Sequence, residues 1–226
     1  MIDLFFNIFP NMAGKGEELL LCTGQTLLMM FISGIISFAI GIVLGITLIV
    51  TMKGGILENV VFWTILDKIV NFFRSVPFII MIALLIPVTR AIVGTAIGTT
   101  GAIVPLVFGT APFFTRQMQA ALAEIEKGSI EAAQSMGTSP LGIIFRIYFK
   151  ESVPQIIRGV TITFISLVGL TAMAGAIGGG GLGDFAIRYG YQRYQTDVTI
   201  ITVIILVALV TVIQSMGDFI IKKLSH

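Results

Sequence analysis

The chain has 226 residues, of which 56% are hydrophobic and only 12% are charged, and its mean hydropathy is +1.00. Soluble domains carry about 25% charged residues, so a water-soluble fold of this size would leave too much apolar surface uncovered. The net charge of +2 gives no indication of a nucleic-acid partner. The composition therefore predicts an all-α, polytopic membrane protein.

Thiol and imidazole chemistry is nearly absent, because Cys22 is the single cysteine and His226 the single histidine. One cysteine allows no internal disulfide and no paired-thiol metal site. We therefore expect no catalytic residue, metal or cofactor in this chain. Residues 1–18 lack the basic start and apolar core of a signal peptide, which predicts a mature N-terminus forming a short surface segment.

Five charge-free stretches approach or exceed the length of about 20 apolar residues that crosses a bilayer. They are Leu19–Met52, Ser75–Thr89 extended by Ile69–Phe73, Ala91–Thr115, Gly159–Gly183 and Val198–Gly217. Only Arg90 separates the second stretch from the third. We expect about five transmembrane helices in one membrane domain, residues 19–221.

The distribution of basic residues predicts an orientation by the positive-inside rule. With the N-terminus outside, ten basic residues lie on inner segments: Lys53, Lys68, Arg74, Arg116, Lys127, Arg146, Lys150, Arg158, Lys222 and Lys223. Four lie on outer segments: Lys15, Arg90, Arg188 and Arg193. The long loop 116–158 and the tail 222–226 are therefore expected in the cytoplasm, and residues 1–18 outside.

Small residues recur every four positions in the first stretch, at Ser33, Ser37, Gly41 and Gly45. Such spacing lets two helices approach closely in lipid, where dispersion requires short distances. The stripe predicts either packing within one bundle or a face for a second copy.

The cytoplasmic loop contains a helix–turn–helix pattern. Ala132 and Ala133 favour a helix, and Gly137 can take the left-handed conformation that ends one. Ser139 is a good N-cap and Pro140 suits the first turn of the next helix. That helix carries an apolar face and a basic face: Ile143, Ile144, Ile147 and Tyr148 on the first, Arg146 and Lys150 on the second. The pair predicts either a compact knob for a groove on a soluble partner or an amphipathic connector on the membrane.

Glu131-Ala132-Ala133, followed three residues later by Gly137, resembles the signature loop of ABC import permeases. In that family the loop forms coupling helices that dock on the ATPase subunit, which implies this role for Glu131, Ala132, Ala133 and Gly137. The pattern departs at Phe149-Lys150, where the family has Leu-Pro, and the next proline is Pro154.

Longer strings extend the resemblance from about Cys22 to Gly217. Phe73–Ile80 resembles the second-helix motif of amino-acid permeases. Further strings are similar to the methionine-import permeases: Ile86–Arg90, Ile92–Thr95, Ala102–Leu106, Gly180–Gly183 and Tyr189–Tyr191. The resemblance implies a permease homodimer in the bacterial inner membrane, two cytoplasmic ATPase chains that bind ATP and Mg, and an external binding lipoprotein.

Gly178, Gly180 and Gly183 match the spacing of a dinucleotide fingerprint, which requires a soluble strand–turn–helix unit. Here the motif closes a membrane span, and Asp184 stands where a P-loop needs lysine. The glycines predict instead a plain flexible turn or an unwound segment beside a substrate path.

The remaining candidates for the substrate path or gate are Arg74, Pro77, Met173, Gly175, Gly180 and Gly181. Arg74 either snorkels to the cytoplasmic surface or forms a gate or dimer contact. Met173, beside small residues, either packs in the bundle or lines a cavity.

Other functions remain open on the sequence. An ion-coupled secondary transporter usually keeps ionisable residues within the membrane, and the charge-free stretches have none. An intramembrane enzyme would need a nucleophile–base pair that the stretches lack. The substrate of an ABC importer could also be another amino acid or an osmolyte.

Overall fold

The computed structural model describes residues 9–224, and within that range every regular element is helical. The elements are η1 (Pro10–Met12), α2 (Gly16–Thr51), α3 (Val60–Ser75), α4 (Phe78–Leu84), α5 (Ile86–Val93), α6 (Gly98–Ala123), α7 (Lys127–Ser135), α8 (Pro140–Ile143), η2 (Ile144–Tyr148), α9 (Phe149–Glu151), α10 (Val153–Ala174), η3 (Gly175–Gly179), α11 (Gly181–Phe185), η4 (Ala186–Tyr191) and α12 (Thr196–Leu224). Of the predicted N-terminal segment 1–18, residues 1–8 lie outside the described range, and of the predicted tail 222–226, residues 225 and 226 do.

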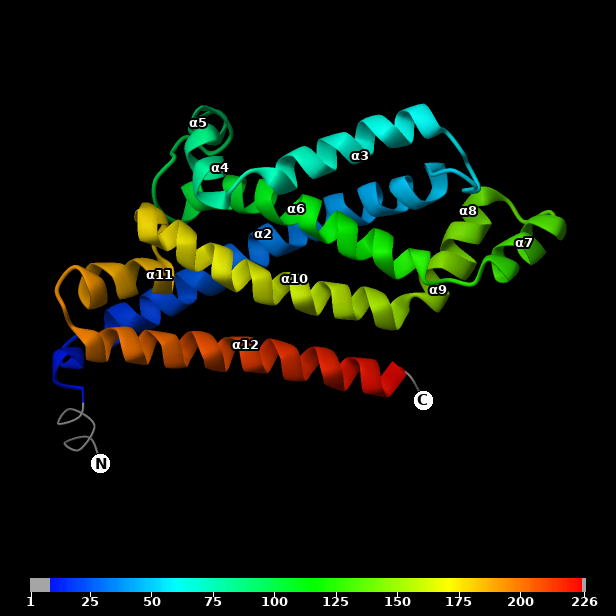
Figure 1. Cartoon of the computed structure of the whole chain (residues 1–226). Coiled ribbons are helices and arrows are strands. Elements are labelled where there is room, and N and C mark those ends of the chain that lie inside the picture. The colour runs from blue at the N-terminus through cyan, green and yellow to red at the C-terminus, as the bar shows by residue number, and fades with distance from the viewer. Residues whose placement is uncertain (1–8, 225–226) are drawn as a thin grey trace.

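The long helices lie side by side and run roughly along one direction. In Figure 1, α2, α3, α6, α10 and α12 run roughly along the molecule, with α7 and α8 at one end and α11 at the other. We refer to these as the knob end and the glycine end. Asn11 is hydrogen-bonded to Asp197, so the first described turn lies beside the start of α12, at the glycine end. The helix α12 then runs toward the knob end (Figure 1).

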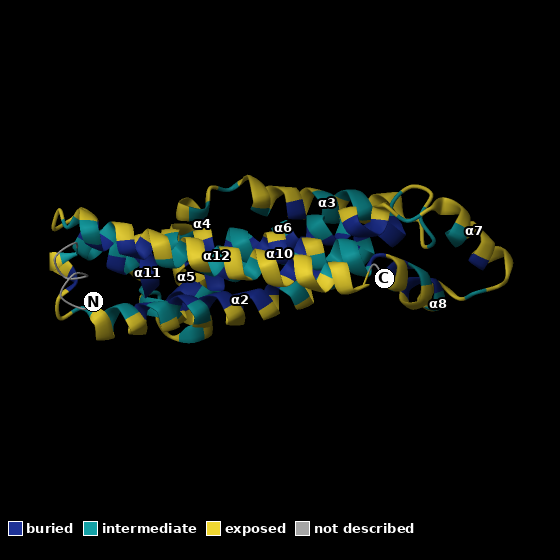
Figure 2. Cartoon of the chain, turned by 90° about the horizontal axis from the view of Figure 1, so that it is seen from below, coloured by how far each residue is buried: buried dark blue, intermediate teal, exposed yellow. Residues whose placement is uncertain are grey.

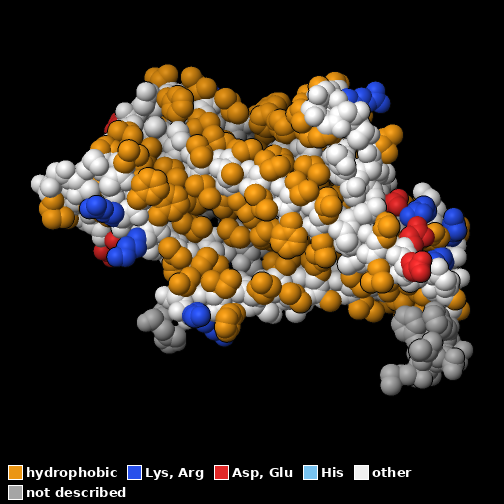
Figure 3. All heavy atoms as spheres, turned by 180° about the vertical axis from the view of Figure 1, so that it is seen from behind, with side chains coloured by type: hydrophobic (Ala, Val, Ile, Leu, Met, Phe, Trp, Pro, Cys, Tyr) orange, Lys and Arg blue, Asp and Glu red, His pale blue; other side chains and the backbone are white. Residues whose placement is uncertain are grey.

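Three helical segments of the described chain are long and apolar enough to cross a membrane: Gly16–Thr51, Val153–Gly179 and Thr196–Leu224. They correspond to the first, fourth and fifth expected spans. Their outward faces are exposed and apolar, whereas the faces of α2 and α6 that meet are buried (Figure 2). Figure 3 shows a broad hydrophobic band across the middle of one face, with the charges gathered mainly toward the two ends.

The second and third expected spans are wrong in their bounds. No continuous helix covers Ser75–Thr89, because the backbone is extended at Val76, ψ 122°, before Pro77. Proline disfavours helical geometry in the residue before it and has no N–H to donate. The expected third span is interrupted where α5 ends at Gly94, and α5 and α6 meet at an angle of 118°.

The helix α3, which overlaps only the start of the expected second span, carries charged residues. The Asp67 carboxylate lies 2.6 Å from the Arg116 guanidinium of α6. The same guanidinium donates to Asn71 Oδ1 at 2.9 Å and to Gln119 Oε1 at 2.6 Å. Pairing lowers the cost of keeping these charges in a helical bundle, so α3 packs against α6 although its sequence is not charge-free.

The small-residue stripe of α2 packs against α6. A Cβ at Gly41 would lie 2.6 Å from Cδ1 of Phe114 and 3.1 Å from the backbone N of Thr115. A Cβ at Gly45 would lie 2.6 Å from that of Met118. Ser33 and Ser37 are fully buried in the same bundle. The stripe therefore packs within one bundle, as the first of the two interpretations predicts.

Gly45→Ala tests this contact. Because the added Cβ would meet the Met118 side chain and the Thr115 carbonyl, we expect a loss of roughly 1–3 kcal/mol from overpacking. The measurement is the thermal unfolding midpoint of the purified protein in detergent. Gly24→Ala in the same helix is the matched control, because nothing lies within 4 Å of its added Cβ. Equal midpoints for the two variants would show that α2 and α6 are not in close contact there.

Candidate functional site: the knob, the cavity and the broken helix

The knob, α7 to α9 (127–151), turns at Gly137. That glycine has φ +74°, which confirms the predicted left-handed conformation. Its N–H donates to the Gln134 carbonyl at 2.9 Å, and the N–H of Thr138 donates to the Ala133 carbonyl at 3.0 Å. This pair of bonds is the Schellman arrangement that ends a helix. The turn is therefore fixed by the backbone and depends on glycine at this position.

The second helix of the knob begins as predicted and is longer than one turn. The Ser139 hydroxyl accepts from the Gly142 N–H at 3.2 Å, and Pro140 occupies the first turn. The helix continues through η2 and α9 to Glu151 and ends at Ser152, ahead of Pro154. Its predicted apolar face is confirmed, because Ile143, Ile144 and Tyr148 are buried, and Ile147 packs against the same cluster.

The two alanines of the signature loop, both expected to contact the ATPase, differ in exposure. Ala132 is exposed, but Ala133 is buried and packs in a cluster with residues from α2, α6 and the knob. Its members are Ile49, Val50, Met118, Leu122, Ala133, Ile143, Ile144 and Tyr148. Ala133 therefore seats the knob on the bundle and cannot contact a partner through its side chain. The reason is its position on the inner side of α7, which the sequence alone does not fix.

The outer surface of the knob carries apolar side chains that the sequence analysis did not single out. Met136, Leu141 and Phe145 are 78%, 67% and 65% exposed. Glu131, on α7, is exposed as well. Their positions, away from the buried face of the knob helices, are the feature by which the sequence could have indicated them.

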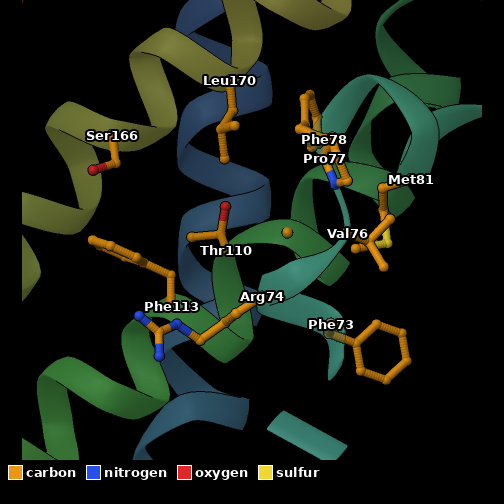
Figure 4. A pocket seen from close by; sticks show the side chains of 11 residues that line it. Phe73, Arg74, Val76, Pro77, Phe78, Met81, Thr110, Phe113, Ser166 and Leu170 are labelled. Carbon is orange, nitrogen blue, oxygen red and sulfur yellow. The ribbon is translucent and has the colours of Figure 1, made fainter. Parts of the chain in front are cut away.

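A cavity of about 390 Å³ opens between α3, α4, α6 and α10. It is lined by Phe73, Arg74, Val76, Pro77, Phe78, Met81, Gly109, Thr110, Phe113, Ser166 and Leu170. Two predicted path residues, Arg74 and Pro77, meet here. Figure 4 shows Arg74 extending toward Phe113. Because Thr110 and Phe113 lie near the middle of α6, Arg74 lies at mid-length of the helical bundle.

The other predicted path residues lie at the glycine end and not in the cavity. The helix α10 ends at Ala174, and the backbone turns through Gly178 and Gly180, at φ +93° and +75°. The short helix α11 then packs back on α10, where a Cβ at Gly175 would lie 2.5 Å from the backbone N of Asp184. Met173, 43% exposed, lies one turn beyond the cavity residue Leu170. The helix is therefore interrupted at these glycines.

Two side chains of α2 hold the start of α11. Gln25 Oε1 accepts from the Gly181 N–H at 2.8 Å, and Thr26 Oγ1 accepts from the Leu182 N–H at 2.8 Å. These bonds satisfy the first free donors of the short helix, which would otherwise be buried without partners. The N–H groups of the glycine run are thus bound by the protein's own side chains. A dinucleotide site requires a strand before the glycines, and here a helix precedes them.

Charged side chains close the glycine end. Arg188 pairs with Glu18 at 2.7 Å and with Asp184 at 3.0 Å, so it ties η4 to the start of α2. The Tyr189 hydroxyl donates to Glu18 at 2.6 Å, and this bond raises the pKa of the phenol. The charge of the Asp184 carboxylate is compensated by Arg188, one turn away.

Comparison with known proteins relates most of the chain to one family. The family model described as binding-protein-dependent transport system inner membrane component matches residues 37–226. The probable D-methionine transport system permease protein MetI of Vibrio cholerae is 48% identical over 98% of this chain and 99% of its own. The methionine import system permease protein MetP of Bacillus subtilis is 44% identical over 76% of this chain and 78% of its own.

Solved structures agree with the fold. A chain from inward-facing conformations of the MetNI methionine ABC transporter superposes with a TM-score of 0.92 at 43% identity, covering 94% of this chain and 98% of that one. A chain of an amino acid ABC transporter crystallised with histidines superposes with a TM-score of 0.78 at 16% identity, over 95% and 98% of the two chains. The second likeness concerns the fold alone.

Proposed function

We propose a transport mechanism for this chain, which belongs to the family of binding-protein-dependent transport system inner membrane components. The chain is a permease subunit of an ABC importer and not the ATPase. A permease of this kind forms the path for the substrate and changes which side is open when nucleotide binds elsewhere. The observation that carries the proposal is the knob, a rigid and apolar projection seated on one end of a membrane bundle.

We propose that the bundle spans a bacterial inner membrane about five times. The knob end faces the cytoplasm, so the segment 116–158, which comprises the end of α6, the knob and the start of α10, and the tail 222–226 are cytoplasmic. The glycine end and residues 1–18 face outward. The opposite positions of η1 and the end of α12 support an odd number of crossings. The broken segment from α3 through α5 serves as the second span, and membrane lipid covers the exposed apolar faces.

The proposed partners are a second copy of this chain, two cytoplasmic ATPase subunits and an external substrate-binding lipoprotein. ATP and Mg bind the ATPase subunits. The knob docks there through Glu131, Ala132 and the exposed apolar side chains, while Ala133 and Gly137 set its position and shape. Because the knob shares a buried cluster with α2 and α6, a displacement of the knob moves both helices. The permease thereby alternates between inward-open and outward-open states.

The substrate path includes Arg74 and Pro77 at the cavity and Met173, Gly175, Gly180 and Gly181 at the broken end of α10. Broken helices at membrane depth occur where backbone lines a cavity or is held by protein. The glycines let α11 fold back against α10, and Met173 continues the same face of α10 as Leu170. Together they form an aligned series of positions from the glycine end to the middle of the bundle.

The proposed substrate is methionine. Two relatives that carry methionine in their names are 48% and 44% identical over 98% and 76% of this chain, and this supports the assignment. Transport of another amino acid or of an osmolyte uses the same machine and differs in the cavity. An ion-coupled mechanism would need a free carboxylate at membrane depth, and Asp67 in α3 is paired with Arg116.

Uptake by reconstituted vesicles tests the proposal. The permease, its ATPase and the binding protein should accumulate radiolabelled methionine when ATP is supplied on the cytoplasmic side, with no effect of a protonophore. Unlabelled methionine should compete, whereas glycine betaine should not. Uptake that follows an ion gradient without ATP, or ATP hydrolysis by the isolated permease chain, would contradict the proposal.

Substitution of Gly137 tests the coupling role of the knob. The left-handed backbone costs a residue with a Cβ roughly 1–2 kcal/mol, and a β-branched one more. Nothing lies within 4 Å of an added Cβ, so strain in the turn is the only penalty. We expect Gly137→Val to leave membrane insertion intact but to weaken ATPase docking or to separate hydrolysis from uptake.

Gly137→Asn is the matched control, because asparagine tolerates the left-handed region. It should be milder than valine in docking and uptake at equal membrane levels. Glu131→Ala should be milder still, since exposed ion pairs contribute about 0–1 kcal/mol. If the valine variant couples hydrolysis to uptake as the wild type does, the turn has no part in coupling.

A further inference from the structure

The cavity beside α6 combines one cation with apolar walls. We propose that it is a binding site for the transported molecule within the membrane domain, and that Arg74 binds the carboxylate of a neutral amino acid with an apolar side chain. The inference rests on the proposed transport function and adds to it the site and the chemical groups that recognise the substrate.

The guanidinium of Arg74 lacks a protein partner. It makes no hydrogen bond or ion pair with any residue of the described range 9–224. The carboxylate two turns earlier on the same helix, Asp67, is already bound to Arg116. Arg74 is exposed in the single chain, but in the proposed orientation it lies at membrane depth, where an unpaired arginine is costly and marks a substrate path. A carboxylate is the ligand that a guanidinium binds best, through two parallel hydrogen bonds.

A second polar group at the cavity is also unsatisfied. Thr110 is 1% exposed, and its hydroxyl has no hydrogen-bond partner within residues 9–224. Buried threonines elsewhere in the bundle, such as Thr115 and Thr163, donate to the carbonyl four residues earlier at 2.8 and 2.7 Å. Buried hydroxyls without partners are rare and require an explanation. A polar group of a bound amino acid, either its carboxylate or its amine, would supply the partner.

The remaining walls select for an apolar side chain. Phe78 and Met81 of α4 and Leu170 of α10 line the cavity with apolar side chains, in contrast to the charged guanidinium of Arg74. Gly109 keeps the space open, because a Cβ there would lie 3.1 Å from Cδ2 of Phe78. The volume of about 390 Å³ lies within the range of roughly 300–1,000 Å³ for small-molecule sites. Thioether sulfur makes favourable contacts with aromatic rings, whereas a charged side chain would lose its hydration here.

Direct binding to the permease–ATPase complex, purified without the binding protein, tests the site. Equilibrium dialysis with radiolabelled methionine should show saturable binding. Methioninamide, which has no carboxylate, should compete at least about tenfold less well, as expected for loss of hydrogen bonds to a charged group. Arg74→Ala should weaken methionine binding by a similar factor and abolish the preference over methioninamide.

Three further variants separate recognition from folding. Arg74→Lys keeps the charge without the fork of donors and should fall between wild type and alanine. Thr110→Val has nearly the same shape and should cause a smaller loss. Arg90→Ala is the matched control, because Arg90 is an exposed arginine on α5 that does not line the cavity, and it should bind as wild type does.

The outcomes distinguish the two proposals. If the wild-type complex takes up no methionine with ATP and binding protein, the proposed substrate fails. If it takes up methionine but shows no saturable binding, or if Arg74→Ala binds methionine as tightly as wild type, the site is overturned while the transport function stands. If Arg74→Ala fails to assemble with the ATPase, two other comparisons test the site: methionine against methioninamide in the wild type, and Thr110→Val against the wild type for methionine. Equal affinities within each comparison would overturn the site.

Discussion

The close contact between α2 and α6 is the interaction on which the rest of the structure depends. Lipid provides no hydrophobic drive for helix association, so two helices hold together only where small residues let their backbones approach. Gly41 and Gly45 provide that approach against Phe114 and Met118. The two helices form a frame, and both functional ends are attached to it. At the knob end, the knob packs against Ile49 and Val50 of α2 and Leu122 of α6.

At the other end, Gln25 and Thr26 of α2 hold the first N–H groups of α11. The cavity lies between these ends on the opposite side of α6, where Thr110 faces the segment α3–α4. In the proposed mechanism, a displacement of the knob moves this frame, and with it the cavity and the broken helix. The ion pair between Asp67 and Arg116 attaches α3 to the same frame.

Local features were predictable from the sequence, whereas features that depend on tertiary pairing were not. The turn at Gly137 and the cap at Ser139 follow from backbone chemistry within a few residues, and both are confirmed. The helix α3 was not among the predicted spans, because its charges appear costly until Arg116 is placed beside Asp67. The inward position of Ala133 and the unpaired hydroxyl of Thr110 likewise depend on contacts between distant segments. A count of charge-free residues cannot represent either one.

The central claim is that the knob end faces the cytoplasm and the glycine end faces outward, and thiol accessibility tests it most directly. In a Cys22→Ser background, single cysteines would be placed at Lys127 on the knob and at Gln192 beyond η4, both exposed. An impermeant thiol reagent should label position 192 in cells with the outer surface of the inner membrane accessible, and position 127 only after that membrane is permeabilised. Labelling of position 127 but not of 192 before permeabilisation would contradict the account.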